Sequence, residues 1–212
     1  MTLKRFDIIT EADARLLEPG STVVLAPRGH VTPLAADTLR ERRVTVISDD
    51  PGAAAGDLVP VADVRRLAIA SDHSGVALKR TLVAWARARG LAVDDLGVDD
   101  ATPVDYPDVA ARVARAVAKR EADAGIVIDG AGIGSAIAAN KIRGVRAVMA
   151  TTETIARYSR EHNGANVLAL GATLVTQDEA RAIVTTWLTT SMREPRYIRR
   201  LAKIRDLERR TK

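Results

Sequence analysis

The sequence GIVIDGAGIGSAIAANK, residues 125–141, predicts a buried strand, then a glycine-rich turn, then a short helix. The apolar run ends at Asp129, and Gly130, Gly132 and Gly134 follow it. Glycines let backbone N–H groups converge on one point, and a helix start adds partial positive charge. The stretch therefore predicts an oxyanion site with a carboxylate beside it that could act as a base.

The chain around this stretch repeats an alternation of strand and helix. Apolar, strand-like runs occupy residues 67–70, 92–96, 125–128, 145–150 and 166–170. Such alternation is typical of a parallel sheet that helices cover on both faces. We therefore expect an α/β fold with a five-stranded parallel sheet, whose ligands bind at the carboxyl ends of the strands.

Three segments are predicted along the chain, at 1–48, 49–65 and 66–212. The first is a small α/β extension, in which a capping box at Thr10 starts the earlier of two helices. The second is rich in Asp, Ala, Gly and Pro, as linkers are. The third is the main domain. His30 is expected in a solvated loop of the extension.

The composition excludes several kinds of site. The chain of 212 residues has no cysteine and three widely separated histidines, so it lacks thiolate chemistry and zinc-ligand spacing. No apolar run reaches the ~18 residues that a membrane span needs, and acidic residues interrupt the N-terminus where a signal peptide would be apolar. We expect a cytoplasmic protein with no membrane partner and no metal site.

The net charge of +5 is concentrated at the C-terminus. Residues 193–212 contain nine Lys and Arg against three Asp and Glu, so the remainder is close to neutral. Ile198, Leu201, Ile204 and Leu207 recur at helical spacing, and aromatic residues make up only 3% of the chain. We expect a packed amphipathic helix with a solvated basic face, and no nucleic-acid partner.

Two carboxylates at strand ends each leave two interpretations open. Asp72 and His73 follow the first strand of the main domain, where Asp72 is either a ligand contact or a helix cap. Asp129 ends a strand that should be buried on both faces. It is therefore either a general base or a brace that accepts hydrogen bonds from the turn.

Two further groups carry candidate chemistry. His162 and Asn163 follow a helix, where a histidine either complements the helix dipole or acts as an acid or base near neutral pH. Arg196 and Arg200 are four residues apart on one helical face, which suits a phosphate group or plain solvation. With the glycine turn, these are the parts for proton transfer on a phosphorylated small molecule.

The glycine spacing also leaves a nucleotide-binding module as an alternative. A dinucleotide fingerprint would place its third glycine where Ser135 stands, and it would open a longer helix. Glu153 lies roughly where a ribose-binding acid could fall. The match to this fingerprint is incomplete.

Several motifs resemble one known family. SDHSGVALK, VDYPDVA, GIVIDGAGIGSAIAANK and SREHNGANVLALGA, within residues 66–207, are similar to the ribose-5-phosphate isomerase B / galactose-6-phosphate isomerase family. The resemblance implies a Rossmann-like α/β/α sandwich that forms homodimers, often tetramers, with active sites shared between subunits. It also implies interconversion of aldose and ketose phosphates through a cis-enediolate, with no metal and no cofactor.

The resemblance assigns site residues to three groups, which contact the sugar or open its ring, stabilise the enediolate, or hold the phosphate. The groups are Asp72, Tyr106, Asn163 and the ring-opening His162; the amides of Gly130, Gly132 and Gly134; and His73, Arg196 and Arg200.

Five positions depart from the family's pattern. The proton-moving Cys of many members is Asp129 here, and the neighbouring Thr linked to ring opening is Ala131. Ser135 stands where another branch has a Glu base, Thr173 replaces an Arg, and Tyr197 replaces a His. Since a carboxylate can move a carbon-bound proton, we expect Asp129 to be the base.

The expected reaction is the interconversion of ribose 5-phosphate and ribulose 5-phosphate. The alternatives are an isomerase of allose or galactose 6-phosphate, and a non-catalytic sugar-phosphate binder or scaffold, which Ala131 and Thr173 suggest. The extension is similar to short segments of enzymes packaged in bacterial microcompartments. We therefore expect residues 1–64 to dock the enzyme to a shell or partner enzyme, with the enzyme free in the cytoplasm or inside such a compartment.

Overall fold

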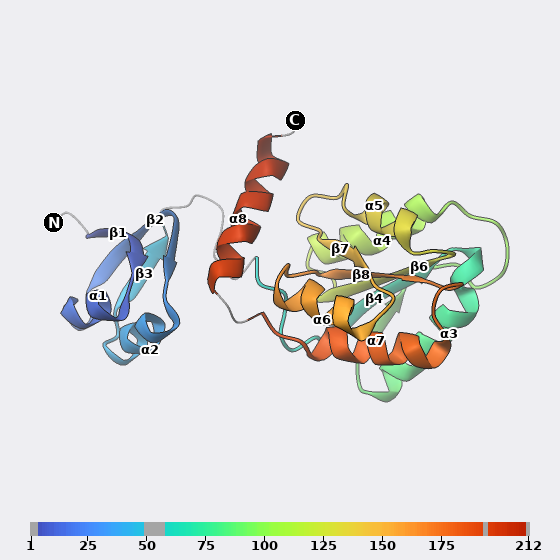
Figure 1. Cartoon of the computed structure of the whole chain (residues 1–212), viewed down its shortest axis with the longest axis horizontal. Coiled ribbons are helices and arrows are strands. Elements are labelled where there is room, and N and C mark those ends of the chain that lie inside the picture. The colour runs from blue at the N-terminus through green and yellow to red at the C-terminus, as the bar shows by residue number, and fades with distance from the viewer. Residues whose placement is uncertain (1–3, 49–57, 193–194, 211–212) are drawn as a thin grey trace. The chain divides into compact units, whose positions relative to one another are not determined.

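The computed structural model describes residues 4–48, 58–192 and 195–210. Contacts divide the chain into two compact units, Met1–Val59 with Glu194–Lys212, and Pro60–Arg193 (Figure 1). The C-terminal helix therefore groups with the N-terminal strands, although the sequence prediction included it in the main domain. Most of the predicted linker, residues 49–57, lies outside the described residues.

The larger unit is built on a five-stranded parallel sheet in the order β5-β4-β6-β8-β7. Its strands are β4 (Arg66–Ser71), β5 (Ala92–Asp95), β6 (Ala124–Asp129), β7 (Ala147–Met149) and β8 (Val167–Gly171). Each neighbouring pair runs parallel. The structure thus confirms the predicted α/β fold and its sheet.

Helices cover both faces of this sheet (Figure 1). They are α3 (Val76–Ala88), α4 (Tyr106–Ala118), α5 (Ile133–Ala139), α6 (Glu153–Glu161) and α7 (Gln177–Thr189). Side chains alternate along a strand, so Leu67 and Ile69 join the core with α3 and α7, whereas Ala68 and Ala70 join the core with α4. The two faces therefore have separate cores, one rich in Leu and Ile and one rich in Ala and Val.

The strand order creates a switch point between β4 and β6. The chain passes from β4 outward to β5 and then returns to β6 on the other side of β4. In such sheets the crevice at the carboxyl ends of these two strands binds ligands. Asp72 follows β4 and Asp129 ends β6, so the fold brings both residues to this crevice.

In the smaller unit, the described residues form a three-stranded parallel sheet, in the order β1-β2-β3, and helices α1, α2 and α8. Its elements are β1 (Arg5–Ile9), α1 (Glu11–Leu16), β2 (Thr22–Val31), α2 (Pro33–Glu41), β3 (Thr45–Ser48) and α8 (Pro195–Arg210). The capping box predicted at Thr10 is present. A separate core joins the strands to α1 and α2 through Ile9, Ala14, Leu17, Val23, Ala35 and Leu39.

The predicted loop around His30 is wrong, because β2 continues to Val31. After a register shift, β1 pairs with His30 and Val31. Gly29 permits this close pairing, since a Cβ at that position would lie 2.8 Å from the carbonyl oxygen of Asp7. Pairing with β1 thus extends β2 through residues that the sequence predicted to be a loop.

Asp123 ties the start of β4 to the start of β6, and its protonation should be measurable in the stability of the protein. Its carboxylate accepts the N–H groups of Arg65 and Arg66 and pairs with the Arg66 guanidinium at 2.7 Å. Burial raises the pKa of Asp123, but hydrogen bonds from the Arg66 side chain and from both backbone N–H groups outweigh burial and hold it below the ordinary 3.8.

We predict that Asp123→Asn lowers the free energy of unfolding at pH 7 by about 1–3 kcal/mol. Because the folded-state pKa is depressed, this contribution is present above pH 3.8 and is lost as the pH falls through the folded-state value. Urea unfolding of wild type and variant at pH 7 and at about pH 2 tests this. A difference that stays the same at both pH values would contradict it.

Candidate active site

Asp129 accepts three backbone hydrogen bonds from the turn that follows it. Its Oδ1 accepts the N–H groups of Ala131, at 2.8 Å, and of Gly132, and its Oδ2 accepts that of Ser135 at 2.9 Å. The residue is 5% exposed. Oδ2 keeps more lone-pair capacity, because it has one donor where Oδ1 has two. The carboxylate thus braces the turn, and Oδ2 is the atom better able to accept a proton.

The glycines of the turn have distinct structural roles. Gly132 has a φ of +75°, and a Cβ there would lie 2.8 Å from the backbone of β8. A Cβ on Gly134 would lie 2.6 Å from the ring of Tyr106, so the ring rests directly on the turn. The Gly132 N–H is taken by Asp129, whereas the N–H groups of Gly130 and Gly134 have no acceptor among the residues that the structure describes. Those two amides are the ones free to meet an oxyanion.

Thr173 closes the turn from the side of β8. Its N–H and its Oγ1 both donate to the carbonyl oxygen of Gly130, at 3.0 and 2.7 Å. The position where the family resemblance expects an Arg therefore holds the turn and offers no cation. Helix α5 has seven residues, and Asp129 occupies three amides at its start, so the turn does not fit the pyrophosphate of a dinucleotide.

Asp72 caps the short 3-10 helix η2 (His73–Gly75) beside this turn. Its Oδ1 accepts the N–H of Ser74 at 2.9 Å, the Ser74 hydroxyl at 2.6 Å and the Gly75 N–H at 3.3 Å. The Ser74 Oγ lies 3.7 Å from where a Cβ of Gly130 would stand, which brings the ends of β4 and β6 together. Sequence reasoning missed Ser74, whose signal is its place two residues after a strand-end Asp.

The loop between β5 and α4 is held against the end of β4 by polar groups. His73 Nδ1 accepts the N–H of Val104 at 3.3 Å, so the neutral ring carries its proton on Nε2. Lys79 is fully buried and pairs with Asp95 at 2.8 Å and with Asp99 at 3.1 Å. The loop leads directly into α4, whose first residue lies on the glycine turn. Sequence reasoning missed Lys79, because helical lysines are usually exposed.

His162 and Asn163 lie at the amino ends of the strands, whereas Asp129 lies at the carboxyl end of β6. They follow α6, which begins beyond the carboxyl end of β7 and returns to the amino end of β8. The same loop contacts the residue before β7, since Arg146 Nε donates to the Gly164 carbonyl at 2.8 Å. The five residues of β8 span roughly 17 Å. Within one chain, the fold therefore separates His162 from Asp129.

Arg160 fixes that loop from the protein interior. Its guanidinium donates to the carbonyl oxygens of Ala165 and Val61, both at 2.9 Å, and lies 4.7 Å from the centre of the Trp187 ring. The residue is fully buried. Burial, with a smaller contribution from Arg146, lowers the pKa of Arg160 to about 10, which still leaves a cation at neutral pH. Sequence reasoning missed this arginine, which carries no motif signal.

Arg196 and Arg200 both lie on α8, in the smaller unit. Arg200 is exposed, and its guanidinium lies 5.6 Å from the ring centre of Tyr197. The side chain of Arg196 is outside the described part of the chain. The predicted phosphate ligands therefore belong to a different structural unit from Asp129.

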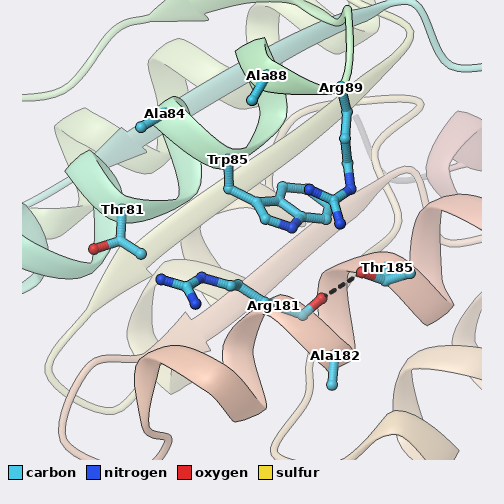
Figure 2. A pocket seen from close by; sticks show the side chains of 8 residues that line it. All are labelled: Thr81, Ala84, Trp85, Ala88, Arg89, Arg181, Ala182 and Thr185. Carbon is cyan, nitrogen blue, oxygen red and sulfur yellow. Dashed lines mark hydrogen bonds between the residues drawn. The ribbon is translucent and has the colours of Figure 1, made fainter.

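A groove of about 630 Å³ lies between α3 and α7, away from the strand ends (Figure 2). The Arg89 guanidinium stacks over the Trp85 ring at 4.3 Å on one side, and Arg181 pairs with Asp178 at 2.8 Å on the other. None of the residues in the sequence-predicted site lines this groove. Over the described ranges, no three His, Asp or Glu side chains gather in a metal-binding cluster, and no helix is both long and apolar enough to cross a membrane.

Comparison with known proteins identifies the family of the larger unit. Residues 67–204 match a family model described as Ribose/Galactose Isomerase. Ribose-5-phosphate isomerase B of Escherichia coli is 41% identical over 147 residues, which cover 69% of this chain and 99% of that protein. A Clostridium thermocellum ribose-5-phosphate isomerase B structure superposes with a TM-score of 0.68 at 45% identity, covering 69% of this chain and 99% of that one.

A ribose-5-phosphate isomerase B from Mycoplasma genitalium, whose structure contains bound ribulose-5-phosphate, superposes with a TM-score of 0.67 at 38% identity. It covers 69% of this chain and 97% of its own. About a third of this chain, its N-terminal part, therefore lies outside the similarity. The remainder places the chain in the ribose/galactose isomerase family.

Proposed function

We propose that this protein interconverts ribose 5-phosphate and ribulose 5-phosphate. The observation that carries the proposal is the Asp129 carboxylate, fixed at the switch point of the sheet beside two unoccupied amides. Family membership supports the substrate class, since the Escherichia coli relative is a ribose-5-phosphate isomerase B and the Mycoplasma genitalium structure holds ribulose-5-phosphate.

In this proposal Asp129 moves the proton. Its Oδ2 takes the proton from C2 of the open-chain aldose, and the C–H electron pair forms the C1–C2 double bond of a cis-enediolate. The N–H groups of Gly130 and Gly134 stabilise the negative oxygen. The proton of the C2 hydroxyl passes to the C1 oxygen, and the carboxyl group then returns its proton to C1 while the C2 oxygen becomes the ketone carbonyl. Asp72 and Tyr106, which border the turn, contact the sugar.

His162 assists ring opening in this proposal, and Asn163 contacts a sugar oxygen. Since these residues and Asp129 lie at opposite ends of the strands in one chain, a complete site needs a second copy. We therefore propose a homodimer, alone or within a tetramer. Each site combines Asp129 and the glycine turn of one chain with the His162 loop of another.

The phosphate binds to His73, Arg196 and Arg200 in this proposal. His73 can donate from Nε2, because the Val104 N–H occupies its Nδ1 lone pair. The two arginines follow each other by one helical turn on α8, which suits two-point binding of a phosphate. No cofactor takes part in the proposed reaction.

A second candidate is an isomerase of a six-carbon sugar phosphate, because the matching family includes galactose isomerases. Turnover of ribose 5-phosphate, allose 6-phosphate and galactose 6-phosphate under the same conditions separates the two. A higher kcat/KM for a hexose phosphate would replace the first proposal. Tight binding of ribose 5-phosphate without turnover of any sugar would favour the binder or scaffold.

We also propose that the extension docks the enzyme to a bacterial microcompartment, through its shell or a partner enzyme. The resemblance of residues 1–64 motivates this, and two exposed leucines support it. Leu16 on α1 is 80% exposed and Leu34 on α2 is 69% exposed, although the two helices contact each other. Exposed leucines on neighbouring helices are suited to a protein partner.

Substituting Asp129 tests the proposed base. We predict that Asp129→Asn lowers kcat at least ~100-fold and abolishes exchange of the C2 proton with deuterated solvent. Asp129→Cys should recover part of both, because a thiolate can also move this proton, whereas it cannot replace three carboxylate hydrogen bonds. Asp178→Asn, at an exposed site, is the control. A folded Asn variant with normal exchange, or a Cys variant as inactive as Asn, would leave Asp129 with the bracing role alone.

Substituting Gly134 tests the position of Tyr106. An added Cβ would lie 2.6 Å from the ring, so Gly134→Ala must move the tyrosine off the turn. We predict a KM for ribose 5-phosphate that rises about tenfold, which corresponds to the loss of one good sugar contact. Gly144→Ala has no neighbour to clash with but strains the backbone at a φ of +83°, so it controls for a general loss of stability. An unchanged KM would mean that Tyr106 does not contact the sugar.

Charged substitutions test the docking surface in the full chain. Leu16→Glu with Leu34→Glu should prevent co-sedimentation with assembled shells while leaving turnover of ribose 5-phosphate unchanged, because both leucines are exposed and lie outside the core of the extension. Glu41→Leu, which adds no charge to the same unit, is the matched control. Co-sedimentation equal to that of the wild type would contradict the docking role of this surface.

A further inference from the structure

Most of helix α8 matches the isomerase family model, but the helix packs against the N-terminal unit, which lies outside that match. The family match extends to residue 204, so it includes the first ten residues of α8. Contacts nevertheless group α8 with the N-terminal strands, and β2 is an element that it touches. The Escherichia coli relative is covered almost completely by 69% of this chain, so the relative offers no counterpart to β2.

Burial along α8 shows which of its side chains are covered. Tyr197 is 7% exposed and Leu201 is 1% exposed, whereas Ile204 is 42% and Leu207 is 64% exposed. The packed part of α8 is therefore its N-terminal half. That half also carries Arg200, one turn before Ile204.

One face of strand β2 packs against α1 and α2, and its other face points away from them. Val23 belongs to the core that the small sheet shares with α1 and α2. Since side chains alternate along a strand, Val24 and Ala26 point to the other face. Ala26 is only 6% exposed and does not belong to the core with α1 and α2, so something else covers it. Of the described elements that contact β2 in this unit, β1 and β3 are its neighbours in the sheet, and α8 is the one that can lie over the Ala26 face of the sheet.

We propose that the N-terminal unit is a platform that holds α8 and so sets the affinity of the enzyme for the phosphate of its substrate. This inference rests on the proposed function, because it takes α8 as the carrier of the phosphate-binding arginines. A 16-residue helix with many basic residues has little intrinsic order in water and depends on packing for its structure. Loss of the platform would leave Arg196 and Arg200 unordered, and the substrate would bear the entropic cost of ordering them.

The test changes the platform and reads the phosphate site in the full chain. Ala26→Arg places a long charged side chain under α8 from the extension, and Leu201→Ser removes the buried contact from the helix itself. Leu16→Arg and Leu207→Ser are the matched controls, since both residues are exposed. The measurements are kcat and KM for ribose 5-phosphate, inhibition by inorganic phosphate, and the rate of tryptic cleavage within α8.

We expect Ala26→Arg and Leu201→Ser each to raise KM and the inhibition constant of phosphate about tenfold, which corresponds to one charge-assisted contact. We expect kcat to stay within about twofold, because Asp129 is untouched, and α8 to be cleaved faster. The control variants should match the wild type. Two variants on opposite sides of the contact guard against a substitution that simply fails to fold.

Faster cleavage of α8 with unchanged KM and phosphate inhibition would overturn the inference, because the helix would be free without consequence. An unchanged rate of cleavage in both variants would also overturn it, because the order of α8 would then not depend on its packing against the N-terminal unit. A wild-type protein without turnover would instead refute the proposed function. The two failures are therefore distinguishable.

Discussion

The hydrogen bonds from three turn amides to the Asp129 carboxylate are the constraint on which the rest of the site depends. They fix the path of the glycine turn. The Tyr106 ring packs on that turn at Gly134, and Gly130 lies beside Ser74. The same bonds take both lone-pair sites of Oδ1 that face the turn and leave Oδ2 with a single donor. A base held in this way is fixed in position, and the Gly130 and Gly134 amides lie beside it to stabilise the enediolate in the proposed reaction.

The sequence predicted what periodicity and strand ends encode. Alternating apolar runs predicted the five-stranded parallel sheet, and the polar residues after two of its strands predicted where Asp72 and Asp129 meet. It left the role of Asp129 open, because a base and a brace need the same residue in the same place. The hydrogen bonds show the brace directly, and the base remains a proposal. The extent of β2 was missed, since pairing with β1 overrides the local loop signal around His30.

Two buried cations hold the loops of the site, and neither has a sequence signal. Lys79 anchors the loop that leads into α4 through two carboxylates, whereas Arg160 holds the His162 loop through backbone carbonyls alone. A buried guanidinium without a carboxylate partner costs desolvation energy, and hydrogen bonds and the Trp187 ring offset part of that cost. Lys79 contacts carboxylates 16 and 20 residues away and Arg160 reaches Val61 across 99 residues, which explains why spacing rules could not find them.

The C-terminal helix shows how a family fold can acquire a dependence on an added unit. An amphipathic helix must bury its apolar stripe somewhere, and here Tyr197 and Leu201 are buried while α8 contacts β2. Once the helix packs on the extension, the free energy of ordering α8 and that of folding the extension become linked. Linkage is reciprocal, so a ligand that orders α8 must stabilise the extension by the same amount. The extension would thereby become part of how the enzyme holds its substrate.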